Sequence, residues 1–328
     1  MKIESVSLFI LNYNGTALLG ECLPGILAAA KKSRRKARVT VIDNHSTDNS
    51  LAFVKERFPE AIASLSTGNR FLISFNEFVE HDSSDAVVLM NNDIKVEEGF
   101  LDPLLDVLEQ KEDALFTSSL CWDFDKTRYE GGLSQLHRKA GIWGTSSVLP
   151  EKLRPDSGSF WFTVSMGACL AFRRDRFLEL GGYDDLYLPG ILEDLDLCYR
   201  GWRKGWRGYF VPESVIYHKG QASFKPAFGN DRIRRMAARN TYFFMWKNVD
   251  DPGLVLLDLL WMPVRMIYAL FRGDKAFARG AWDALQQGQA ALDRRKVREK
   301  DFAMTDRAIL KLFKMQNRLL GASGKTHD

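Results

Sequence analysis

The sequence has few cysteines and little excess charge, and each shortage excludes a class of protein. Its four cysteines, Cys22, Cys121, Cys169 and Cys198, lie far apart and form no Cys-x-x-Cys pair. This spacing argues against a zinc site or a disulfide framework and fits a reducing compartment. The formal net charge of +4 is too small to indicate a nucleic-acid-binding module. No signal peptide is recognised before the first predicted strand, so we expect a cytoplasmic protein.

Two phosphate-binding loops are also missing. No Gly-x-Gly-x-x-Gly follows a predicted strand, which argues against a nicotinamide-dependent dehydrogenase. The first strand is followed by Asn12-Tyr13-Asn14-Gly15, which is not the glycine-rich, basic loop that a sugar nucleotidyltransferase would need. Neither of these enzyme classes therefore fits the start of the chain.

Apolar runs alternate with helical patterns through the first half of the chain. The hydrophobic content of 45% and the aromatic content of 12% are those of a globular protein with a sizeable core. Strands are predicted near 6–11, 39–42 and 86–90, and helices over 16–32, 48–58 and 100–110. This alternation predicts an α/β fold in which helices cover both faces of a parallel sheet.

The remainder of the chain is less regular. We expect loops and short strands over about 120–165, a strand at 162–173, helices at 176–180 and 193–204, and closing strands at 208–211 and 215–218. From about residue 230 the sequence becomes basic and helical. The predicted domains are 1–228, with halves of about 1–120 and 121–228, and a C-terminal region over 229–328.

The segment over 252–272 predicts an amphipathic helix. Its apolar residues, Leu254, Leu257, Trp261, Val264, Tyr268 and Phe271, recur at three- and four-residue steps, while Asp258, Arg265 and Arg272 form a narrow polar stripe. Such a helix either packs its apolar face against the protein, the interpretation we prefer, or lies at a membrane interface. Asp258 and Arg265 argue against a helix that spans a membrane.

Asn91-Asn92-Asp93 ends the predicted strand over 86–90. Ligands of open α/β sheets bind beyond the carboxyl ends of the strands. Mg²⁺ and Mn²⁺ prefer oxygen ligands, usually one or two carboxylates together with substrate phosphates. The turn is therefore a candidate metal site, although asparagine and aspartate are equally suited to a purely structural turn.

Carboxylates also gather at two other element ends. Asp43 ends the second predicted strand and can accept a hydrogen bond from a nucleobase N–H or a ribose hydroxyl, whereas Asp48 suits a helix cap. Glu193, Asp194 and Asp196 open a predicted helix, where acidic residues also favour the helix dipole. Three carboxylates exceed the need of a cap, so this cluster is a candidate general base for an acceptor hydroxyl.

His218 ends the last predicted strand. A neutral imidazole at this position can bind a metal ion or contact a diphosphate. A lone histidine is more often a structural residue, so a ligand role depends on the other strand-end residues lying nearby.

The order of these motifs carries a resemblance to a known family. The matching stretches are Phe9-Ile10-Leu11-Asn12-Tyr13-Asn14, residues 41–48, Leu89-Met90-Asn91-Asn92-Asp93, residues 166–169 and 181–184, Glu193-Asp194-Leu195-Asp196, residues 218–223, and Arg239-Asn240. Together they resemble family 2 inverting glycosyltransferases of the bacterial rhamnosyltransferase-like kind. The resemblance implies a GT-A fold, which is a Rossmann-like, mostly parallel central sheet with flanking helices, here followed by a C-terminal helical extension.

The resemblance also implies a role for each matching residue. Asp194 is the expected general base, and Glu193 is expected to orient the acceptor. Asp93 is expected to hold Mg²⁺ or Mn²⁺, with His218 as a candidate second ligand. The predicted donor-binding residues are Asn12, Asn14, Asp43, Asn44, Asn76, Asn91 and Asn92. Inversion implies one in-line displacement without a covalent enzyme intermediate.

Two stretches depart from the family pattern. Asn91 replaces the first carboxylate of the metal motif, which leaves Asp93 as its one carboxylate. Bulky residues replace glycines over 68–76, where the backbone should approach the nucleotide. Arg70, within this stretch, is a candidate contact for a phosphate.

The predicted function is sugar transfer from a UDP- or dTDP-sugar, with dTDP-rhamnose as one candidate, to a glycan or lipid-linked acceptor in cell-surface polysaccharide synthesis. The alternative is a catalytically degenerate subunit that binds nucleotide sugars in a glycan assembly complex. The altered 68–76 stretch favours this alternative, and the intact Asp93 and Asp194 oppose it. A nucleic-acid partner is not expected. Peripheral contact with the inner face of the plasma membrane through 252–300 is an open alternative, and the sequence does not indicate an oligomeric state.

Overall fold

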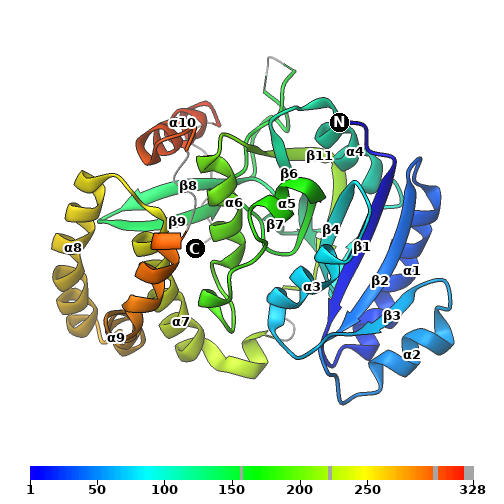
Figure 1. Ribbon diagram of the computed structural model, residues 1–328, viewed down its shortest axis with the longest axis horizontal. Coiled ribbons are helices and arrows are strands. Elements are labelled where there is room, and N and C mark those ends of the chain that lie inside the picture. The colour runs from blue at the N-terminus through cyan, green and yellow to red at the C-terminus, as the bar shows by residue number, and fades with distance from the viewer. Residues whose placement is uncertain (156–157, 221–223, 298–301, 321–328) are drawn as a thin grey trace.

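A nine-stranded sheet with flanking helices forms the larger part of the protein, and a group of C-terminal helices lies at one end of it (Figure 1). The computed structural model describes residues 1–155, 158–220, 224–297 and 302–320. The strand order is β3-β2-β1-β4-β10-β6-β11-β5, with β7 paired to β6.

The first half of the sheet is parallel. Its strands are β1 (Ser5–Asn12), β2 (Lys36–Asp43), β3 (Ile62–Leu65) and β4 (Ala86–Asn91), joined by α1 (Thr16–Lys32), α2 (Ser50–Arg57), η1 (Phe71–Ile73) and α3 (Ser74–Glu80). Consecutive residues of β4 are buried, as expected when both faces of a parallel sheet are covered. The strands and helices predicted for this half are confirmed. Because the strands are parallel, Asn12, Asp43 and Asn91 meet at the same edge.

The second half of the sheet is mixed. It contains β5 (Ile94–Val96), β6 (Ala114–Asp123), β7 (Tyr129–Gly131), β10 (Cys169–Arg173) and β11 (Arg207–His218). A separate hairpin is formed by β8 (Ser134–Lys139) and β9 (Ile142–Ser147), and the helices are α4 (Leu101–Gln110), α5 (Arg174–Glu179), η2 (Asp185–Tyr187) and α6 (Glu193–Arg203). Antiparallel β10 lies between β4 and β6, whereas β6 and β11 are parallel.

Two strand predictions in this half need correction. The strand expected at 162–173 begins only at Cys169, because residues before it make a single bridge, Phe162 to Tyr209, and then turn along a cleft. The two strands expected at 208–211 and 215–218 are one strand, β11, with an irregularity between Val211 and Val215.

The C-terminal helices bury a second hydrophobic core. They are α7 (Phe224–Asn248), which breaks at Gly229, α8 (Pro252–Phe271), α9 (Lys275–Val297) and α10 (Asp306–Leu319). Tyr242 and Phe313 from these helices pack in one cluster with Tyr199 and Trp202 of α6. Helix α6 therefore joins the sheet to the C-terminal helices. The domain division at 228 and 229 stays a prediction.

Helix α8 faces the opposite way from the preferred prediction. Two of the three polar residues of its stripe are turned inward, since Asp258 and Arg265 are only 4% and 8% exposed, whereas Arg272 is exposed. Its apolar face is turned outward, since Leu257, Val264 and Phe271 are 44%, 50% and 87% exposed. The expectation that the apolar face packs against the protein is wrong. Within the described residues, α8 is also the one helix that is long and apolar enough to cross a membrane.

Candidate active site

A cleft of about 720 Å³ lies at the carboxyl ends of β1 and β4. The first turn of α6 and the β8–β9 hairpin form its other walls. Of the predicted site residues, the cleft is lined by Asn12, Asn44, Asn91, Asn92, Asp93, Glu193, Asp194 and His218. The fold therefore gathers residues from across 206 positions of sequence, 12 to 218, around one space.

A network of amides forms the floor at the ends of the parallel strands. The Asn12 amide donates to Asp43 Oδ2 at 3.0 Å, and the Asn12 Oδ1 accepts from Asn92 at 2.7 Å. A Cβ on Gly15 would lie 2.1 Å from Asn92 Nδ2, so only glycine leaves room for this network. The network fixes the turn that carries Asp93.

Asp93 and His218 come together because β11 pairs with β5. His218 is opposite Ile94 in that pairing, and its Nε2 lies 3.4 Å from Asp93 Oδ1. Asp93 is 5% exposed, and its Oδ1 has no hydrogen-bond partner. Buried polar atoms normally have a hydrogen-bond partner or a bound ion. A carboxylate oxygen without a partner, next to an imidazole, therefore suits a divalent cation. The described residues contain no group of three or more acidic, cysteine or histidine ligands, so substrate oxygens and water would complete the coordination.

The charge of the cleft favours a cation too. Glu130, Asp93, Glu193 and Asp194 line it, and none of the described lining residues is lysine or arginine. An anionic diphosphate would meet these carboxylates without any neutralising side chain from the described lining. A bound cation would supply the missing positive charge.

Glu193 and Asp194 are the residues of the first α6 turn that line the cleft. Burial raises the pKa of Glu193 to about 7. Burial, followed by the charge of Glu193, raises the pKa of Asp194 well above its usual range. Oxygens of both carboxylates, Glu193 Oε2 and Asp194 Oδ1, have no hydrogen-bond partner. A Cβ on Gly167 would lie 3.3 Å from Asp194 Oδ2, so the small residue keeps this carboxylate accessible from the cleft.

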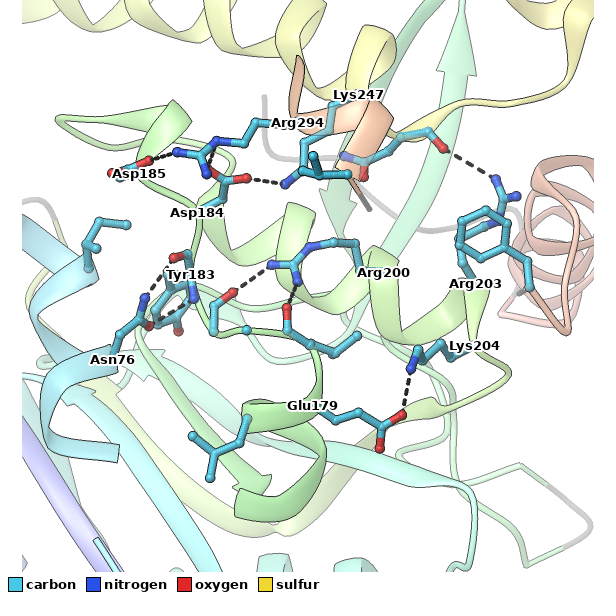
Figure 2. A pocket seen from close by; sticks show the side chains of 18 of the residues that line it. Asn76, Glu179, Tyr183, Asp184, Asp185, Arg200, Arg203, Lys204, Lys247 and Arg294 are labelled. Carbon is cyan, nitrogen blue, oxygen red and sulfur yellow. Dashed lines mark hydrogen bonds and ion pairs between the residues drawn. The ribbon is translucent and has the colours of Figure 1, made fainter. Parts of the chain in front are cut away.

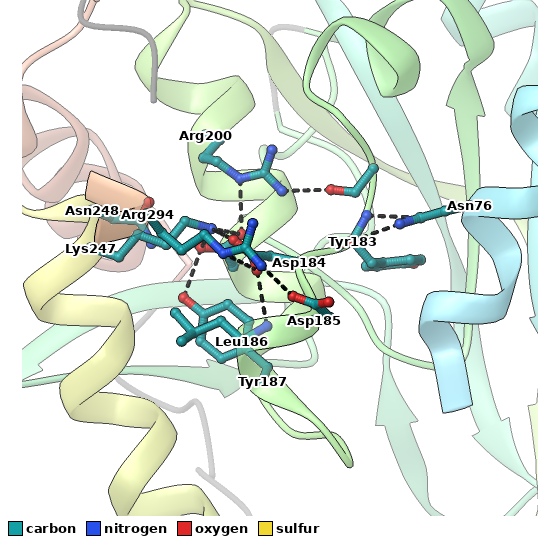
Figure 3. Close-up of polar contacts among 12 residues, drawn as sticks. Asn76, Tyr183, Asp184, Asp185, Leu186, Tyr187, Arg200, Lys247, Asn248 and Arg294 are labelled. Atoms are coloured by element: carbon teal, nitrogen blue, oxygen red, sulfur yellow. Dashed lines mark hydrogen bonds and ion pairs between the residues drawn. The ribbon is translucent and has the colours of Figure 1, made fainter. Parts of the chain in front are cut away.

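Asp196 on the same turn is fully paired. It is 0% exposed and accepts hydrogen bonds from Lys247 at 2.8 Å, Arg200 at 2.9 Å and Asn248 at 2.7 Å. Burial alone would raise the pKa of Asp196, but the charges of Lys247 and Arg200 and the hydrogen bond from Asn248 hold it well below its ordinary value. Figure 3 shows Lys247, Arg200 and Asn248 converging from α6 and α7. Asp196 therefore anchors α6 to the C-terminal helices.

The turn before α6 is held in a strained conformation. Ile191 and Leu192 both have left-handed backbones, with φ of 76° and 78°, which is costly for residues other than glycine. The amide of Asn240 in α7, 0% exposed, donates to the carbonyl oxygens of Tyr187, Gly190 and Ile191 at 2.8 to 3.0 Å. Asn240 thus fixes the loop that presents Glu193 and Asp194.

Some predicted residues do not line the cleft. Asn76 instead bonds both ways to the Tyr183 backbone, at 2.8 and 2.9 Å. Arg70 pairs with Asp185 at 3.0 Å, away from any phosphate position in the cleft. Both line a separate charged cavity of about 510 Å³, which is crossed by ion pairs such as Lys204 to Glu179 (Figure 2).

Two further predicted residues lie behind the cleft. Asp43 is 2% exposed, and its carboxylate already bonds Asn12 and the Ser46 backbone N–H. Asn14 Oδ1 accepts from the Thr47 N–H at 2.7 Å. The last motif, at 218–223, falls in part on residues 221–223, which lie outside the described residues.

Sequence reasoning missed several residues that shape the site. The Tyr183 hydroxyl hydrogen-bonds Asp194, and Lys247 neutralises Asp196. Phe71 and Leu72 of the altered 68–76 stretch line the cleft, and the Phe71 ring lies 6.0 Å from that of Phe228. The glycine-pair motif before Tyr183 signalled importance, but a lysine 51 residues from its partner carries no local signal.

The chain is similar in sequence and in fold to known glycosyltransferases. The N-acetylglucosaminyl-diphospho-decaprenol L-rhamnosyltransferase of Mycobacterium tuberculosis is 28% identical over 242 residues, which are 65% of this chain and 76% of that protein. The mannosyltransferase PcManGT from Pyrobaculum calidifontis, solved with GDP-Man and Mn²⁺, has a TM-score of 0.51 at 16% identity, over 97% of this chain and 88% of that one.

A second solved structure has a similar fold. GalNAc-T7, solved with UDP, GalNAc and Mn²⁺, has a TM-score of 0.58 at 19% identity over 75% of this chain, and the match spans 48% of that chain. Both structural likenesses show the GT-A fold. The model of the family described as "Glycosyltransferase like family 2" matches residues 4–238, well over half of the sequence. The chain therefore belongs to glycosyltransferase family 2 and is a glycosyltransferase with the GT-A fold.

Proposed function

We propose that this enzyme transfers a hexosyl or deoxyhexosyl group from a nucleotide-diphosphate sugar to a hydroxyl of a lipid-linked or glycan acceptor, with inversion. The proposal rests on two pairs of side chains that line the same cleft. Asp93 and His218, the proposed cation ligands, lie 3.4 Å apart, and Glu193 and Asp194 form a carboxylate pair with raised pKa values.

The donor is proposed to be a UDP- or dTDP-sugar, with dTDP-rhamnose first. The relative from Mycobacterium tuberculosis is named as an L-rhamnosyltransferase, which supports a rhamnosyl donor. Asn12, Asn44, Asn91 and Asn92 offer amide donors and acceptors along the floor of the cleft. We assign Asp43 to the nucleoside end through this network, since Asn12 links it to the cleft.

Asp93 and His218 are the residues that would hold Mn²⁺ or Mg²⁺. A carboxylate oxygen and an imidazole nitrogen suit Mn²⁺ better than Mg²⁺, which prefers oxygen ligands alone. When bound, the cation supplies positive charge where the diphosphate leaving group becomes more negative. The described cleft lining offers no lysine or arginine for that purpose.

Asp194 is proposed as the general base. Its carboxylate takes the proton of the acceptor hydroxyl as that oxygen forms a bond to the anomeric carbon. The bond from the anomeric carbon to the diphosphate oxygen breaks, and the nucleoside diphosphate leaves with that electron pair. One displacement inverts the anomeric configuration. Tyr183 orients Asp194, and burial, followed by the charge of Glu193, keeps the pKa of Asp194 raised.

The acceptor is proposed to be lipid-linked and to be met at the cytoplasmic face of the membrane. The relative is named for an acceptor sugar on a diphospho-decaprenol lipid. The cleft wall opposite the parallel strands carries Ser134, Thr145 and Ser147 of the hairpin, whose hydroxyls suit a sugar.

A donor panel tests the proposal. The purified protein is incubated with UDP-, dTDP- and GDP-sugars, with Mn²⁺ or with chelator, and thermal stability is recorded first. Transfer to a synthetic N-acetylglucosaminyl-diphospho-lipid is then followed by mass spectrometry. The proposal expects a stabilising donor that requires Mn²⁺ and a product heavier by one sugar.

The competing function is a degenerate nucleotide-sugar-binding subunit. Its support is the bulky Phe71 and Leu72 in the cleft. This alternative predicts that the protein binds the donor but neither transfers its sugar nor hydrolyses it at any Mn²⁺ concentration. A protein that neither binds nor hydrolyses any nucleotide sugar contradicts both functions.

A further inference from the structure

We propose that α8 is a membrane-docking helix, which lies along the surface of an anionic phospholipid bilayer with its apolar face in the lipid. The observation behind this proposal is an inverted helix. Surface helices of water-soluble proteins turn their charged face to solvent and their apolar face to the core. In α8 the charged residues Asp258 and Arg265 are buried beside Leu254 and Met262, and the face turned to solvent is apolar.

The inward face of α8 is tied down by its charged residues. Asp258 accepts a hydrogen bond from Arg138 Nε at 3.1 Å. Arg265 donates to the Ala140 carbonyl at 2.6 Å and to the Tyr242 hydroxyl at 3.2 Å. Asp258 and Arg265 are seven residues apart, so both lie on one face. These contacts fix the rotation of the helix, and its apolar residues cannot turn inward without breaking them.

The outward face is continuously apolar. Leu256, Leu260, Val264, Ile267, Leu270 and Phe271 are each at least 50% exposed. The helix has 20 residues, and its most apolar window has a mean hydropathy of 1.8 with only 28% of the window buried. Water-soluble monomers rarely expose an apolar surface of this extent.

The packing of α8 favours a helix that lies on the membrane over one that crosses it. Its inward face contacts α9 and the β8–β9 hairpin. A crossing orientation would carry Arg138, Asp258 and charged positions of α9 such as Asp283 toward the hydrocarbon, where charges are costly. With α8 parallel to the surface, only its apolar face enters the lipid.

Unpaired cations border the apolar face and select an anionic surface. Arg272 and Lys275 follow the end of α8, and Arg279 is one turn into α9. All three are exposed, and none forms an ion pair with a described carboxylate. Lys275 and Arg279 also line a groove of about 760 Å³ together with Arg232 and Asp231, in which Asp274 and Asp283 are paired with Arg234 and Arg235. Basic residues beside an embedded apolar face are the usual partners of acidic lipid headgroups.

The β8–β9 hairpin connects α8 to the cleft. Its tip, Ala140 and Gly141, rests on α8, and its other end carries Ser134 and Ser147 of the cleft wall. Strands of six residues span roughly 20 Å. If the acceptor is lipid-linked, as the proposed function holds, docking at α8 brings its sugar along the hairpin to the cleft.

Vesicle sedimentation tests the docking surface without any assay of transfer. The full chain is mixed at low salt with vesicles of phosphatidylcholine, with or without phosphatidylglycerol. The test variant is Leu260→Glu with Ile267→Glu. The matched control is Ile62→Glu with Leu65→Glu, which places the same charges on exposed apolar residues of β3 at the other end of the molecule (Figure 1). Arg272→Gln, Lys275→Gln and Arg279→Gln together test headgroup selection.

Docking predicts that wild type and the β3 control sediment with anionic vesicles, and that the α8 variant binds about tenfold less or weaker still. The triple glutamine variant should lose its preference for anionic over neutral vesicles. Equal binding by wild type and the α8 variant overturns the proposal, as does a wild type that stays in the supernatant. A stable dimer that is broken by the α8 variant and ignores vesicles assigns the face to a second copy instead. Unchanged donor-induced stabilisation in every variant shows that each remains folded, so failed docking and failed transfer are read separately.

Discussion

The first turn of α6 has two sides, and its carboxylates differ in every physical respect. Glu193 and Asp194 face the cleft with unpartnered oxygens and raised pKa values. Asp196 faces inward, is paired with Lys247 and Arg200, and has a lowered pKa. Two residues of sequence therefore separate the proposed proton acceptor, Asp194, from a structural anchor, Asp196.

The difference shows how this fold separates reactivity from stability. Unpaired buried carboxylates are costly, and they persist where the surrounding structure fixes them. Here the fixing groups are Asp196, held by α7, and Asn240, which holds the loop before the turn. The C-terminal helices thus hold the first turn of α6 in place, and α7 also contributes Ala227 and Phe228 to the cleft lining.

The largest expected effect comes from removing the proposed base, Asp194, and it tests the difference between Asp194 and Asp196. Asp194→Asn should lower the transfer rate by about 10²- to 10⁴-fold, because the acceptor proton loses its acceptor. Its melting temperature at neutral pH should not fall, because no ion pair is lost. Steady-state transfer and a thermal melt check both parts. Retention of near wild-type transfer would remove Asp194 from the mechanism.

The corresponding substitution of the inward-facing, paired carboxylate is Asp196→Ala. It leaves Lys247 and Arg200 buried without their carboxylate, so we expect a loss of about 3–5 kcal/mol in unfolding free energy. Urea denaturation followed by circular dichroism measures this loss. Adding Lys247→Met should restore part of it. An unfolding free energy close to wild type would show that Asp196 is not an anchor.

A smaller effect comes from pH. The pKa of Glu193 is about 7 against an ordinary value of 4.5. Between these values the folded chain holds a proton that the unfolded chain has released, so unfolding free energy falls as pH rises. Glu193→Gln should flatten this slope and stabilise the protein at pH 8, by about 3 kcal/mol at most, because one pKa unit corresponds to about 1.4 kcal/mol. Denaturation at pH 5 to 8 tests it, and parallel slopes for wild type and variant would contradict the assignment.

The smallest expected effect is that of removing the Asn240 side chain, which holds the loop before α6. Asn240→Ala leaves three carbonyls without their donor and relaxes the strained Ile191 and Leu192. We expect kcat to fall about tenfold, or roughly 1.4 kcal/mol, while the donor KM changes little. A change in donor KM alone would place Asn240 in donor binding instead.

Much of the sheet was predictable because local patterns determine it. Apolar runs ending in Asn12, Asp43 and Asn91-Asn92-Asp93 gave both the strands and the shared edge. The orientation of α8 was not predictable, because a helical pattern separates two faces without saying which one meets the protein. Arg138 and Ala140, which decide it, lie more than a hundred residues earlier.

The site was predictable to the extent that its residues stand at strand ends. Asp93 and His218 meet only through the β5–β11 pairing, which no local pattern reveals. Asn76 was expected at the donor, but its amide is satisfied by the Tyr183 backbone. The role of Lys247 depends on a buried partner, Asp196, whose environment the sequence does not show.

The pH dependence of transfer at saturating donor and Mn²⁺ tests the central claim most directly. Burial raises the pKa of Asp194, and a carboxylate base must lose its proton before it can act, so kcat should rise with pH between 5 and 8, where an ordinary aspartate is already ionised. The Asp196 side of the turn should leave no mark on this profile. A kcat that is constant from pH 5 to 8 would contradict the account, because the base would then be a carboxylate with an ordinary pKa.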